Sequence, residues 1–396
     1  MKIMNSKQNL LLSAIALLAA LMAAPAFAAE TPSGKKKSSA AESGEDLFAK
    51  PKVLRFKIDL PDSAQESLRK EPKRYVKATL HEAGRTYTDI GVRLKGSGSF
   101  SNISDKPSLS IKFDEFVKDQ ELRGRGRILL NDSHKDPMYL CEALGGEVFR
   151  EAGVPAAKIT FARVEMNGRD LGLYVVAEAA NKDFLSQYFK KAKGNLYEGS
   201  KNDVSDKLEK DGGDSSTDQA DLRALANAIK EPDLAARWKK LTPLLDLERF
   251  AAFAAAEVLI GHHDGYTMDR NNYRIYHDPA SGQMVFLPHG MDEIFTKTDD
   301  PLIPEWKGLV AKAVLTSPTG QRQFLDKMSA LLSTTCKAEI LLGHVDQLSS
   351  LIRPVLAEHD SGATKAFDGE VARFRERIGK RIAFLNQQIK SQAAAK

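Results

Sequence analysis

The chain has 396 residues, of which 42% are hydrophobic and 28% charged, with 27 Gly, 16 Pro and 2 Cys. This composition is typical of a globular protein, and it excludes a collagen-like chain, a disulfide-based miniprotein and a chain disordered throughout. The formal net charge of +5 is not gathered into a dense basic block, so we expect no nucleic-acid partner.

The first 28 residues have the order of charged, apolar and small residues that is typical of a secretory signal peptide. Lys2 and Lys7 precede an apolar run over residues 10–23, and a small-residue cleavage site, Ala26-Phe27-Ala28, follows. The run is shorter than the roughly 20 apolar residues of a membrane span. We therefore predict cleavage after Ala28, a secreted or periplasmic protein and no membrane span after cleavage, with an uncleaved anchor as the alternative. Residues 29–50, rich in Ser, Lys and Ala, predict a flexible tether.

The first half of the folded part has the two-residue hydrophobic alternation of a β-sheet. Between residues 86 and 95, apolar residues share one face while Arg93 and Lys95 share the other. Asn167-Gly168 lies between two such apolar arms, which is the strongest short signal for a hairpin. We predict strands over residues 53–58, 75–80, 86–95, 109–113, 158–166 and 171–178.

One helix is predicted within this sheet, and helices dominate the rest of the chain. Asp136-Pro137 is typical of a helix start, so we predict a helix from there to about Arg150. We also predict an exposed loop over residues 199–221, an apolar central helix over 244–260, short strands over 273–277 and 284–287, and an amphipathic helix over 366–389. This order indicates a two-lobed α+β domain over residues 51–396, with an N-terminal β-rich lobe at 51–180 and a mainly helical C-terminal lobe at 181–396.

The two cysteines, Cys141 and Cys336, lie far apart in the sequence. An exported protein can form a disulfide, but geometry decides whether it does, so a bridge and two buried free thiols both stay open. No Cys-x-x-Cys motif is present, which argues against a redox motif and against a cysteine-based zinc site.

The most informative stretch for chemistry lies between residues 261 and 295. The predicted central helix leads into a loop with Asp264, Asn271 and Asn272, and a short hairpin then leads to Asp292. Phosphoryl transfer to a hydroxyl needs one carboxylate to accept the proton, an amide and a second carboxylate to hold Mg²⁺ or Mn²⁺, and a lysine to neutralise phosphate charge. Each residue alone could equally form a turn, because Asp and Asn are ordinary loop residues.

Half of the eight histidines lie in the same stretch, at His262, His263, His277 and His289. Together with Asp264 and Asp292 they would also suit a metal-dependent phosphoesterase. No His-Glu-x-x-His motif is present, and adjacent histidines rarely bind one ion from a regular helix or strand. Histidines that only form hydrogen bonds are therefore favoured.

Several short motifs follow one another in a fixed order. They are GVRLKGS at 91–97, KPSLSIKF at 106–113, FREAGVP at 149–155, MNG at 166–168, GLYVVAE at 172–178, Phe184-Leu185, GNLY at 194–197 and the block from Asp264 to Asp292. In these motifs the chain resembles the CotH family, spore-coat-type proteins with an atypical protein-kinase fold, from about residue 51 to the C-terminus. The resemblance implies a kinase-like fold and the use of ATP with Mg²⁺ or Mn²⁺.

The resemblance also implies roles for the acidic and amide residues. Asp264 is similar to the catalytic aspartate, Asn271 or Asn272 to the metal-binding asparagine, and Asp292 to the metal-binding aspartate. Many family members carry Asp-x-Asp at the last position, whereas this chain has Gly290-Met291-Asp292 after Pro288-His289. If the earlier carboxylate binds the metal, the kinase would be weakened or inactive.

The nucleotide-binding positions follow from the same resemblance. Lys112 resembles the lysine that pairs with phosphate, although a solvated strand residue is the equal alternative, and Lys95 and Arg93 compete for the role. The remaining implied positions are Glu142 or Glu147 as the helix partner of that lysine and Glu178 as the start of the hinge between the lobes.

We therefore expect an exported CotH-like kinase that transfers the γ-phosphoryl group of ATP to Ser or Thr of an exported, envelope or coat protein. A catalytically inactive, kinase-like binding module of the cell envelope is the first alternative, because ATP is scarce outside the cytoplasm and a fold does not prove a chemistry. The His/Asp metal-dependent phosphoesterase is the second.

Overall fold

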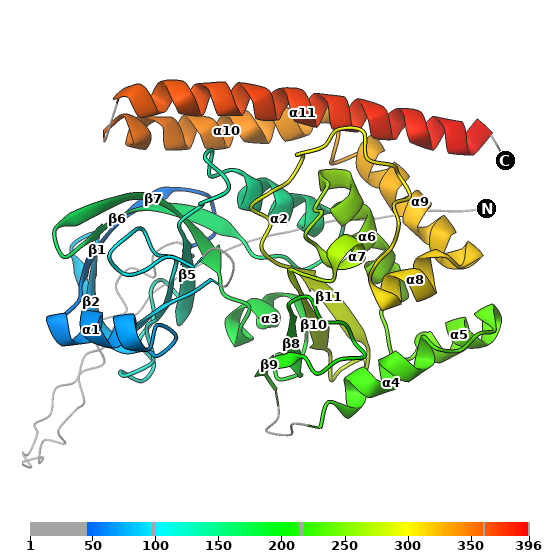
Figure 1. Ribbon diagram of the computed structural model, residues 1–396, viewed down its shortest axis with the longest axis horizontal. Coiled ribbons are helices and arrows are strands. Elements are labelled where there is room, and N and C mark those ends of the chain that lie inside the picture. Colours follow the sequence, from blue (N-terminus) through cyan, green and yellow to red (C-terminus); the bar gives the residue numbers. More distant parts are fainter. Residues whose placement is uncertain (1–45, 97–99, 214–217, 359–360, 395–396) are drawn as a thin grey trace, which may run out of the picture. The chain divides into compact units, whose positions relative to one another are not determined.

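The computed structural model describes residues 46–96, 100–213, 218–358 and 361–394, which form a β-barrel followed by a mainly helical part (Figure 1). The signal peptide predicted over residues 1–28 and most of the tether predicted over 29–50 lie outside these residues. Within the described ranges, no helix has the length and apolar character that crossing a bilayer requires.

The first half of the chain closes into a seven-stranded barrel. Its strands are β1 (Val53–Asp59), β2 (Val76–Glu82), β3 (Arg85–Leu94), β4 (Leu109–Lys112), β5 (Arg127–Asn131), β6 (Ile159–Met166) and β7 (Arg169–Glu178). They pair in the order β1-β2-β3-β4-β5-β7-β6, and β1 closes the barrel by pairing in parallel with β6. The six predicted strands are confirmed to within a few residues. Strand β5 and the helix α1 (Asp62–Lys70) were not predicted.

The chain segment before β1 belongs to the barrel and not to a tether. Leu47 and Phe48 are only 0% and 4% exposed, and they pack with the barrel interior. Asp46 accepts two hydrogen bonds from the guanidinium of Arg125, at 2.8 and 2.9 Å. The prediction of a tether was therefore wrong for residues 46–50, where two apolar side chains next to an ion pair are enough to anchor the chain.

Helix α2 (Cys141–Glu151) begins four residues after Pro137, the predicted first helical residue. The buried Asp136 carboxylate accepts the backbone N–H groups of Met138 and Cys141, at 3.0 and 2.7 Å. Tyr139, between them, has a left-handed φ of 62°, which no α-helix contains. Asp136 thus caps the helix from a loop that precedes it.

The second half of the chain is built around one buried helix. The helices are α3 (Lys182–Tyr188), α4 (Ala220–Ala228), α5 (Leu234–Leu241), α6 (Leu247–Ile260), α7 (Tyr266–Asp269), α8 (Leu309–Leu315), α9 (Pro318–Ser333), α10 (Ala338–Ala357) and α11 (Ser361–Ala394). Twelve of the fourteen residues of α6 are buried, as its apolar sequence predicts. Phe149 of α2 packs against Phe253 of α6, with ring centroids 5.4 Å apart.

A separate four-stranded sheet lies beside α6. Its strands are β8 (Leu196–Gly199), β9 (Glu209–Gly212), β10 (Tyr273–His277) and β11 (Met284–Pro288), in the order β11-β10-β8-β9. The predicted hairpin over 273–287 is confirmed. The loop predicted over residues 199–221 contains β9 and the start of α4. Cys141 and Cys336 are both buried free thiols.

Helices α10 and α11 run side by side and lie along both the barrel and the helical part (Figure 1). At the barrel, Glu358 just after α10 forms ion pairs with Arg55 of β1 and Arg163 of β6, each at 2.7 Å. At the helical part, α11 packs against α6 and α9. The helix pair therefore bridges the two halves of the folded chain.

Candidate functional site

The loop that carries Asp264 is fixed to the end of the buried helix α6. Gly261 ends that helix with a left-handed φ of 64°, a conformation that favours glycine. The side chain of Glu257, in the last turn, accepts the backbone N–H groups of Tyr266 and Thr267 at 2.8 and 2.9 Å and the hydroxyl of Thr267 at 2.5 Å. Burial raises the pKa of Glu257 to about 7. One buried carboxyl thus positions the start of α7, directly after Asp264.

Asp264 is an ionised carboxylate with a partner at each oxygen. The amide of Asn272 donates to Oδ2 at 2.8 Å, and Nζ of Lys201 lies 3.3 Å from Oδ1. Partial burial raises the pKa of Asp264, but hydrogen bonds involving Asn271, Asp269 and Lys201 outweigh it and hold the pKa below its usual value. The side chain keeps 41% of its surface exposed. An accessible, ionised carboxylate of this kind can accept a proton.

The second predicted acid, Asp292, lies close enough to Asp264 for the two charges to interact. Burial is the main cause that raises the pKa of Asp292, Lys135 opposes it, and Asp264 adds to it. Asp292 in turn adds to the raised pKa of Asp136, about 6, and of Glu142, about 7, although burial is the larger cause for both. Asp264 and Asp292 are thus among several carboxyl groups whose charges act on one another.

This region suits a hard divalent cation. Asp264, Asp292 and the amide of Asn272 supply oxygen donors, and repulsion among the nearby carboxylates is what a bound dication would relieve. In the described part of the chain, no three side chains of His, Cys, Asp or Glu are grouped to hold a metal by themselves. A site with few protein ligands, completed by water and substrate oxygens, is typical of Mg²⁺.

Lys95, and not Lys112, is joined to the helix that faces this region. Its ammonium donates to the side-chain carbonyl of Asn131, whose amide donates to both carboxylate oxygens of Glu142 at 2.7 and 2.8 Å. Burial lowers the pKa of Lys95, and Glu142 partly offsets this. A chain of hydrogen bonds thus connects the end of β3, β5 and helix α2.

The other candidates for the phosphate role have different partners. Lys112 pairs with Glu115 at 2.7 Å, near the turn after β4. The Arg93 guanidinium lies 4.9 Å from the ring centroid of Tyr75. Glu147 pairs with His344 at 3.0 Å. The structure thus brings Lys95 and Glu142 together through Asn131, and it places Lys112, Arg93 and Glu147 elsewhere.

A narrow cavity lies between the barrel and the helical part, next to these groups. Its lining includes the apolar residues Leu129, Ile159, Ala177 and Leu287 and the polar residues Asn131, Glu142, Arg274 and His289, together with Gly290. Glu178, at the end of β7, lines the cavity as well. Its carboxylate accepts a hydrogen bond from the amide of Gln187 at 2.6 Å and forms an ion pair with Arg125 at 3.3 Å. The cavity measures about 40 Å³, room for only a few water molecules. The cavity is thus lined by both apolar and charged side chains, but it is too small in this conformation for a drug-sized ligand.

Gly290, where the family resemblance leads us to expect the first Asp of Asp-x-Asp, is crowded by the side chain of Asn272. Its φ of +57° is left-handed, and a Cβ there would lie 2.8 Å from both Cγ and Oδ1 of Asn272. The amide of Asn272 also donates to the Gly290 carbonyl at 3.2 Å. Asn272 therefore fills the space that an acid at position 290 would need.

The four histidines of this stretch point to different partners. His262 meets the carbonyl of His289 at 3.2 Å, His263 meets Asp300 at 2.7 Å, His277 meets Asp221 at 3.0 Å, and His289 lies 3.9 Å from Glu198. They do not converge on one point. The geometry gives the phosphoesterase alternative no ligand set.

Sequence reasoning missed two cations of the site. Arg274 on β10 pairs with Glu198 at 2.6 Å and lines the cavity. Burial opposes ionisation of Glu198, but Arg274 outweighs it and lowers the pKa to about 2. Arg274 could have been noticed as a charged residue within a buried hairpin. Lys201 lies in the polar segment after β8, where nothing in the sequence marks it.

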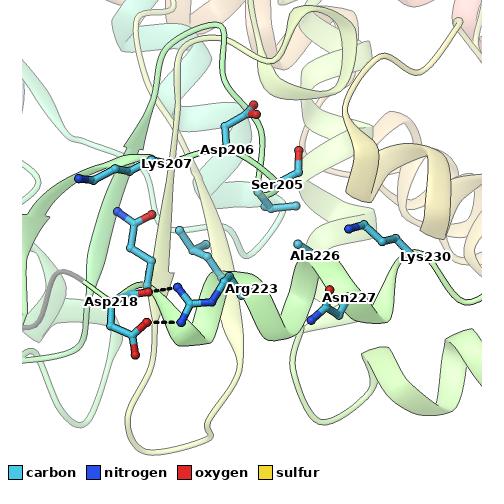
Figure 2. A pocket seen from close by; sticks show the side chains of 11 residues that line it. Ser205, Asp206, Lys207, Asp218, Arg223, Ala226, Asn227 and Lys230 are labelled. Carbon is cyan, nitrogen blue, oxygen red and sulfur yellow. Dashed lines mark hydrogen bonds and ion pairs between the residues drawn. The ribbon is translucent and has the colours of Figure 1, made fainter.

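A second cavity, of about 420 Å³, lies between the loop over residues 204–207 and helix α4 (Figure 2). Its floor includes Val204, Leu222 and Ala226, and its rim carries Lys207 and Lys230. Gln219 ties the loop to the start of α4, because its side chain makes two hydrogen bonds to the backbone of Leu208, at 2.6 and 3.2 Å.

Comparison with known proteins places the chain in a family. The family model described as "CotH kinase protein" matches residues 92–390, about three quarters of the chain. A curated relative, the "Inner spore coat protein H" of Bacillus subtilis (strain 168), is 26% identical over 262 residues, which cover 62% of this chain and 67% of the relative.

Among solved structures, the chain is similar to the Helicobacter pylori proinflammatory kinase CtkA, with 12% identity, a TM-score of 0.31 and coverage of 72% of this chain and 95% of that one. The Shewanella oneidensis MR-1 toxin–antitoxin complex of HipA, HipB and operator DNA gives 12% identity, a TM-score of 0.27 and coverage of 88% and 76%. With TM-scores this low, the family assignment depends on the sequence match. The chain belongs to the CotH kinase protein family.

Proposed function

We propose that this protein is an exported kinase that transfers the γ-phosphoryl group of ATP to Ser or Thr hydroxyls of a protein. Family membership supports kinase chemistry. The observation that carries the proposal is the carboxylate of Asp264: it is ionised, accessible, held by Asn272 at 2.8 Å and electrostatically coupled to the second acid, Asp292.

In this proposal the barrel and the helical part serve as the two lobes of a kinase-like fold. ATP would supply the phosphoryl group, and a bound Mg²⁺ or Mn²⁺ would neutralise the charge of its phosphates. Asn272 and Asp292 would hold the metal, and Lys95 and Arg274 would face the phosphates. Lys95 replaces Lys112 in this role because its hydrogen-bond chain reaches Glu142 on α2, whereas Lys112 pairs with Glu115.

The proposed transfer is a single displacement. The hydroxyl oxygen of the acceptor forms a bond to the γ-phosphorus while the bond from that phosphorus to the bridging oxygen breaks, and ADP leaves with the electron pair. The hydroxyl proton passes to Asp264, whose exposed carboxylate then releases it to water. Orientation of the hydroxyl and neutralisation of charge by Lys95 and Arg274 would supply most of the rate.

Two features support an exported or coat protein as the substrate. Residues 1–28 have the pattern of a signal peptide, and the curated relative is named as an inner spore coat protein. The second candidate function is a catalytically inactive binding module, which Gly290 favours because the first acid of Asp-x-Asp is missing and Asn272 fills its place.

The test is incorporation of phosphate from γ-labelled ATP with Mg²⁺ or Mn²⁺, into the protein itself and into a Ser-rich peptide. We expect Asp264→Asn to lower incorporation by at least about a hundredfold, since general-base catalysis contributes about 10²–10⁴. Asp326→Asn, on the exposed face of α9, is the charge-matched control and should equal the wild type.

Each other outcome selects an alternative. Equal incorporation in the wild type and Asp264→Asn would remove Asp264 as the base. Binding of ATP without transfer would identify the inactive module. Metal-dependent release of phosphate without preference for ATP would revive the phosphoesterase.

A further inference from the structure

A lysine from outside the catalytic loop reaches the proposed base. Lys201 lies two residues after β8, yet its Nζ is 3.3 Å from Oδ1 of Asp264, and it also pairs with Asp269 of α7. The two partners are 63 and 68 positions away in the sequence. The contact is therefore made by the fold and not by a local turn.

The backbone next to Lys201 is anchored on three sides. The buried Asp203 accepts the hydroxyl of Tyr266 at 3.0 Å and the backbone N–H of Leu309 at 2.9 Å. The carbonyl of Asn202 accepts the hydroxyl of Tyr273 at 2.9 Å. Because these bonds go to α7, α8 and β10, the segment cannot shift without disturbing the elements around the catalytic loop.

The conformation of Lys201 is itself unusual. Its φ of 59° lies in the left-handed region, which costs a non-glycine residue of order 1 kcal/mol or more. The contacts of the neighbouring residues Asn202 and Asp203 hold the backbone of Lys201 in this conformation. The anchored neighbours thus impose a backbone conformation that sends this side chain to Asp264 and Asp269.

We propose that Lys201 is a positioning residue of the active site, which orients Asp264 toward the acceptor hydroxyl and ties α7 to β8. This inference rests on the proposed function. Asn272 holds one oxygen of Asp264 at 2.8 Å and Lys201 holds the other at 3.3 Å, so the two together determine the plane of the carboxylate. The longer of the two contacts is the weaker one, which leaves Oδ1 the oxygen more readily offered to a hydroxyl.

An ordinary surface ion pair is the competing explanation. Lys201 is 59% exposed, and such pairs contribute only about 0–1 kcal/mol to stability. A surface pair would leave turnover unchanged when the lysine is removed. A positioning residue instead changes kcat, because a small misplacement of the reacting groups slows the chemical step strongly.

The experiment compares Lys201→Met, Lys201→Arg and the control Lys207→Met. Lys207 belongs to the same segment, lies at the rim of the second cavity (Figure 2), and has no hydrogen bond or ion pair with any residue that the structure describes. We expect Lys201→Met to lower kcat by about tenfold to a hundredfold with the KM for ATP changed less than twofold. Lys201→Arg should recover at least a third of kcat, and Lys207→Met should match the wild type.

Hydrogen–deuterium exchange of residues 262–272 gives a readout that needs no catalysis. We expect faster exchange there in Lys201→Met and unchanged exchange in Lys207→Met. Wild-type kcat and wild-type exchange in Lys201→Met would overturn the inference, as would an equal loss in the arginine variant. If the wild type transfers no phosphate at all, the proposed function fails, and the exchange data alone decide whether Lys201 positions Asp264.

Discussion

The side-chain nitrogen of Asn272 lies 2.8 Å from Oδ2 of Asp264 and 3.2 Å from the carbonyl of Gly290. One amide therefore joins the loop after α6 to the segment after β11, which carries Asp292. Asn272 itself has a left-handed φ of 47°, a conformation that asparagine tolerates better than most residues. Its backbone and its side chain are both specialised for this position.

We predict that Asn272→Ala lowers kcat/KM by about tenfold to a hundredfold and raises the Mg²⁺ concentration needed for half-maximal activity, because groups that orient a metal site are worth that much. Activity titrated with Mg²⁺ measures both effects, with circular dichroism to confirm folding. Asn271→Ala changes the neighbouring amide, which also lowers the pKa of Asp264, and it should lower kcat/KM less than Asn272→Ala does. A larger loss in Asn271→Ala would transfer the metal-binding role to that residue.

Restoring the first acid of Asp-x-Asp should harm the protein. In Gly290→Asp the new Cβ meets Asn272 at 2.8 Å, whereas Gly282→Asp has the same kind of positive φ and nothing within 4 Å. We expect Gly290→Asp to be less stable than Gly282→Asp by about 1–3 kcal/mol in urea unfolding, and to gain no activity. A gain in phosphate transfer would show that Asn272 can move aside.

Lys95 and Lys112 can be separated by nucleotide binding. Lys95→Met should weaken the affinity for a non-hydrolysable ATP analogue by about tenfold or more, since a hydrogen bond to a charged group is worth about 1.5–3 kcal/mol. Lys112→Met, whose partner is the neighbouring Glu115, should change it less than twofold. Titration calorimetry measures the affinity of both variants. A larger loss of affinity in Lys112→Met than in Lys95→Met would assign the phosphate contact to Lys112.

Glu257 makes stability depend on pH in a predictable direction. Its pKa rises from 4.5 to about 7 on folding, so the folded state binds the proton more tightly between these values. Stability due to this group is therefore fully present below about pH 4.5 and falls as pH rises toward 7, by about 1–2 kcal/mol between pH 5.5 and 7.5.

Glu257→Gln removes this titration. We expect the variant to be less stable than the wild type at pH 5.5, because one amide oxygen cannot accept all three hydrogen bonds, and to show a smaller change in unfolding free energy between pH 5.5 and 7.5. Urea unfolding of both proteins at the two pH values measures it. Equal changes in the two proteins would contradict the assignment.

Local patterns predicted the elements that local chemistry determines. The alternation in β3 and the Asn167-Gly168 turn identified barrel strands, and the all-round apolar sequence identified α6 as central. Asp264, Asn271 or Asn272, and Asp292 could be proposed as site residues because they follow such elements closely. The predicted start of α2 was wrong because Asp136 caps the helix across the four residues 137–140, which in the sequence look like the first turn of the helix.

The residues that were missed or left open depend on contacts between distant segments. Lys201 lies in a polar stretch like any surface loop, and only the hydrogen bonds of Asp203 to Tyr266 and Leu309 bring it to Asp264. The sequence also left open whether Lys95 or Lys112 would contact phosphate. Both lie in or next to strands with alternating hydrophobicity, and they differ in that Lys95 donates to Asn131.

The bridge formed by α10 and α11 bears on how a nucleotide gains entry. A cavity of about 40 Å³ is far smaller than the few hundred Å³ that a drug-sized ligand occupies, so in the proposed function the space between the barrel and the helical part must widen for ATP to enter. On the barrel side, the ion pairs that would have to separate include the pair of Glu358 with the exposed Arg55, which resists separation only weakly, and the pair of Glu358 with Arg163, whose side chain is 21% exposed. Helices α10 and α11 contact both the barrel and the helical part. In the proposed function they would keep these two parts connected while the entrance opens and closes.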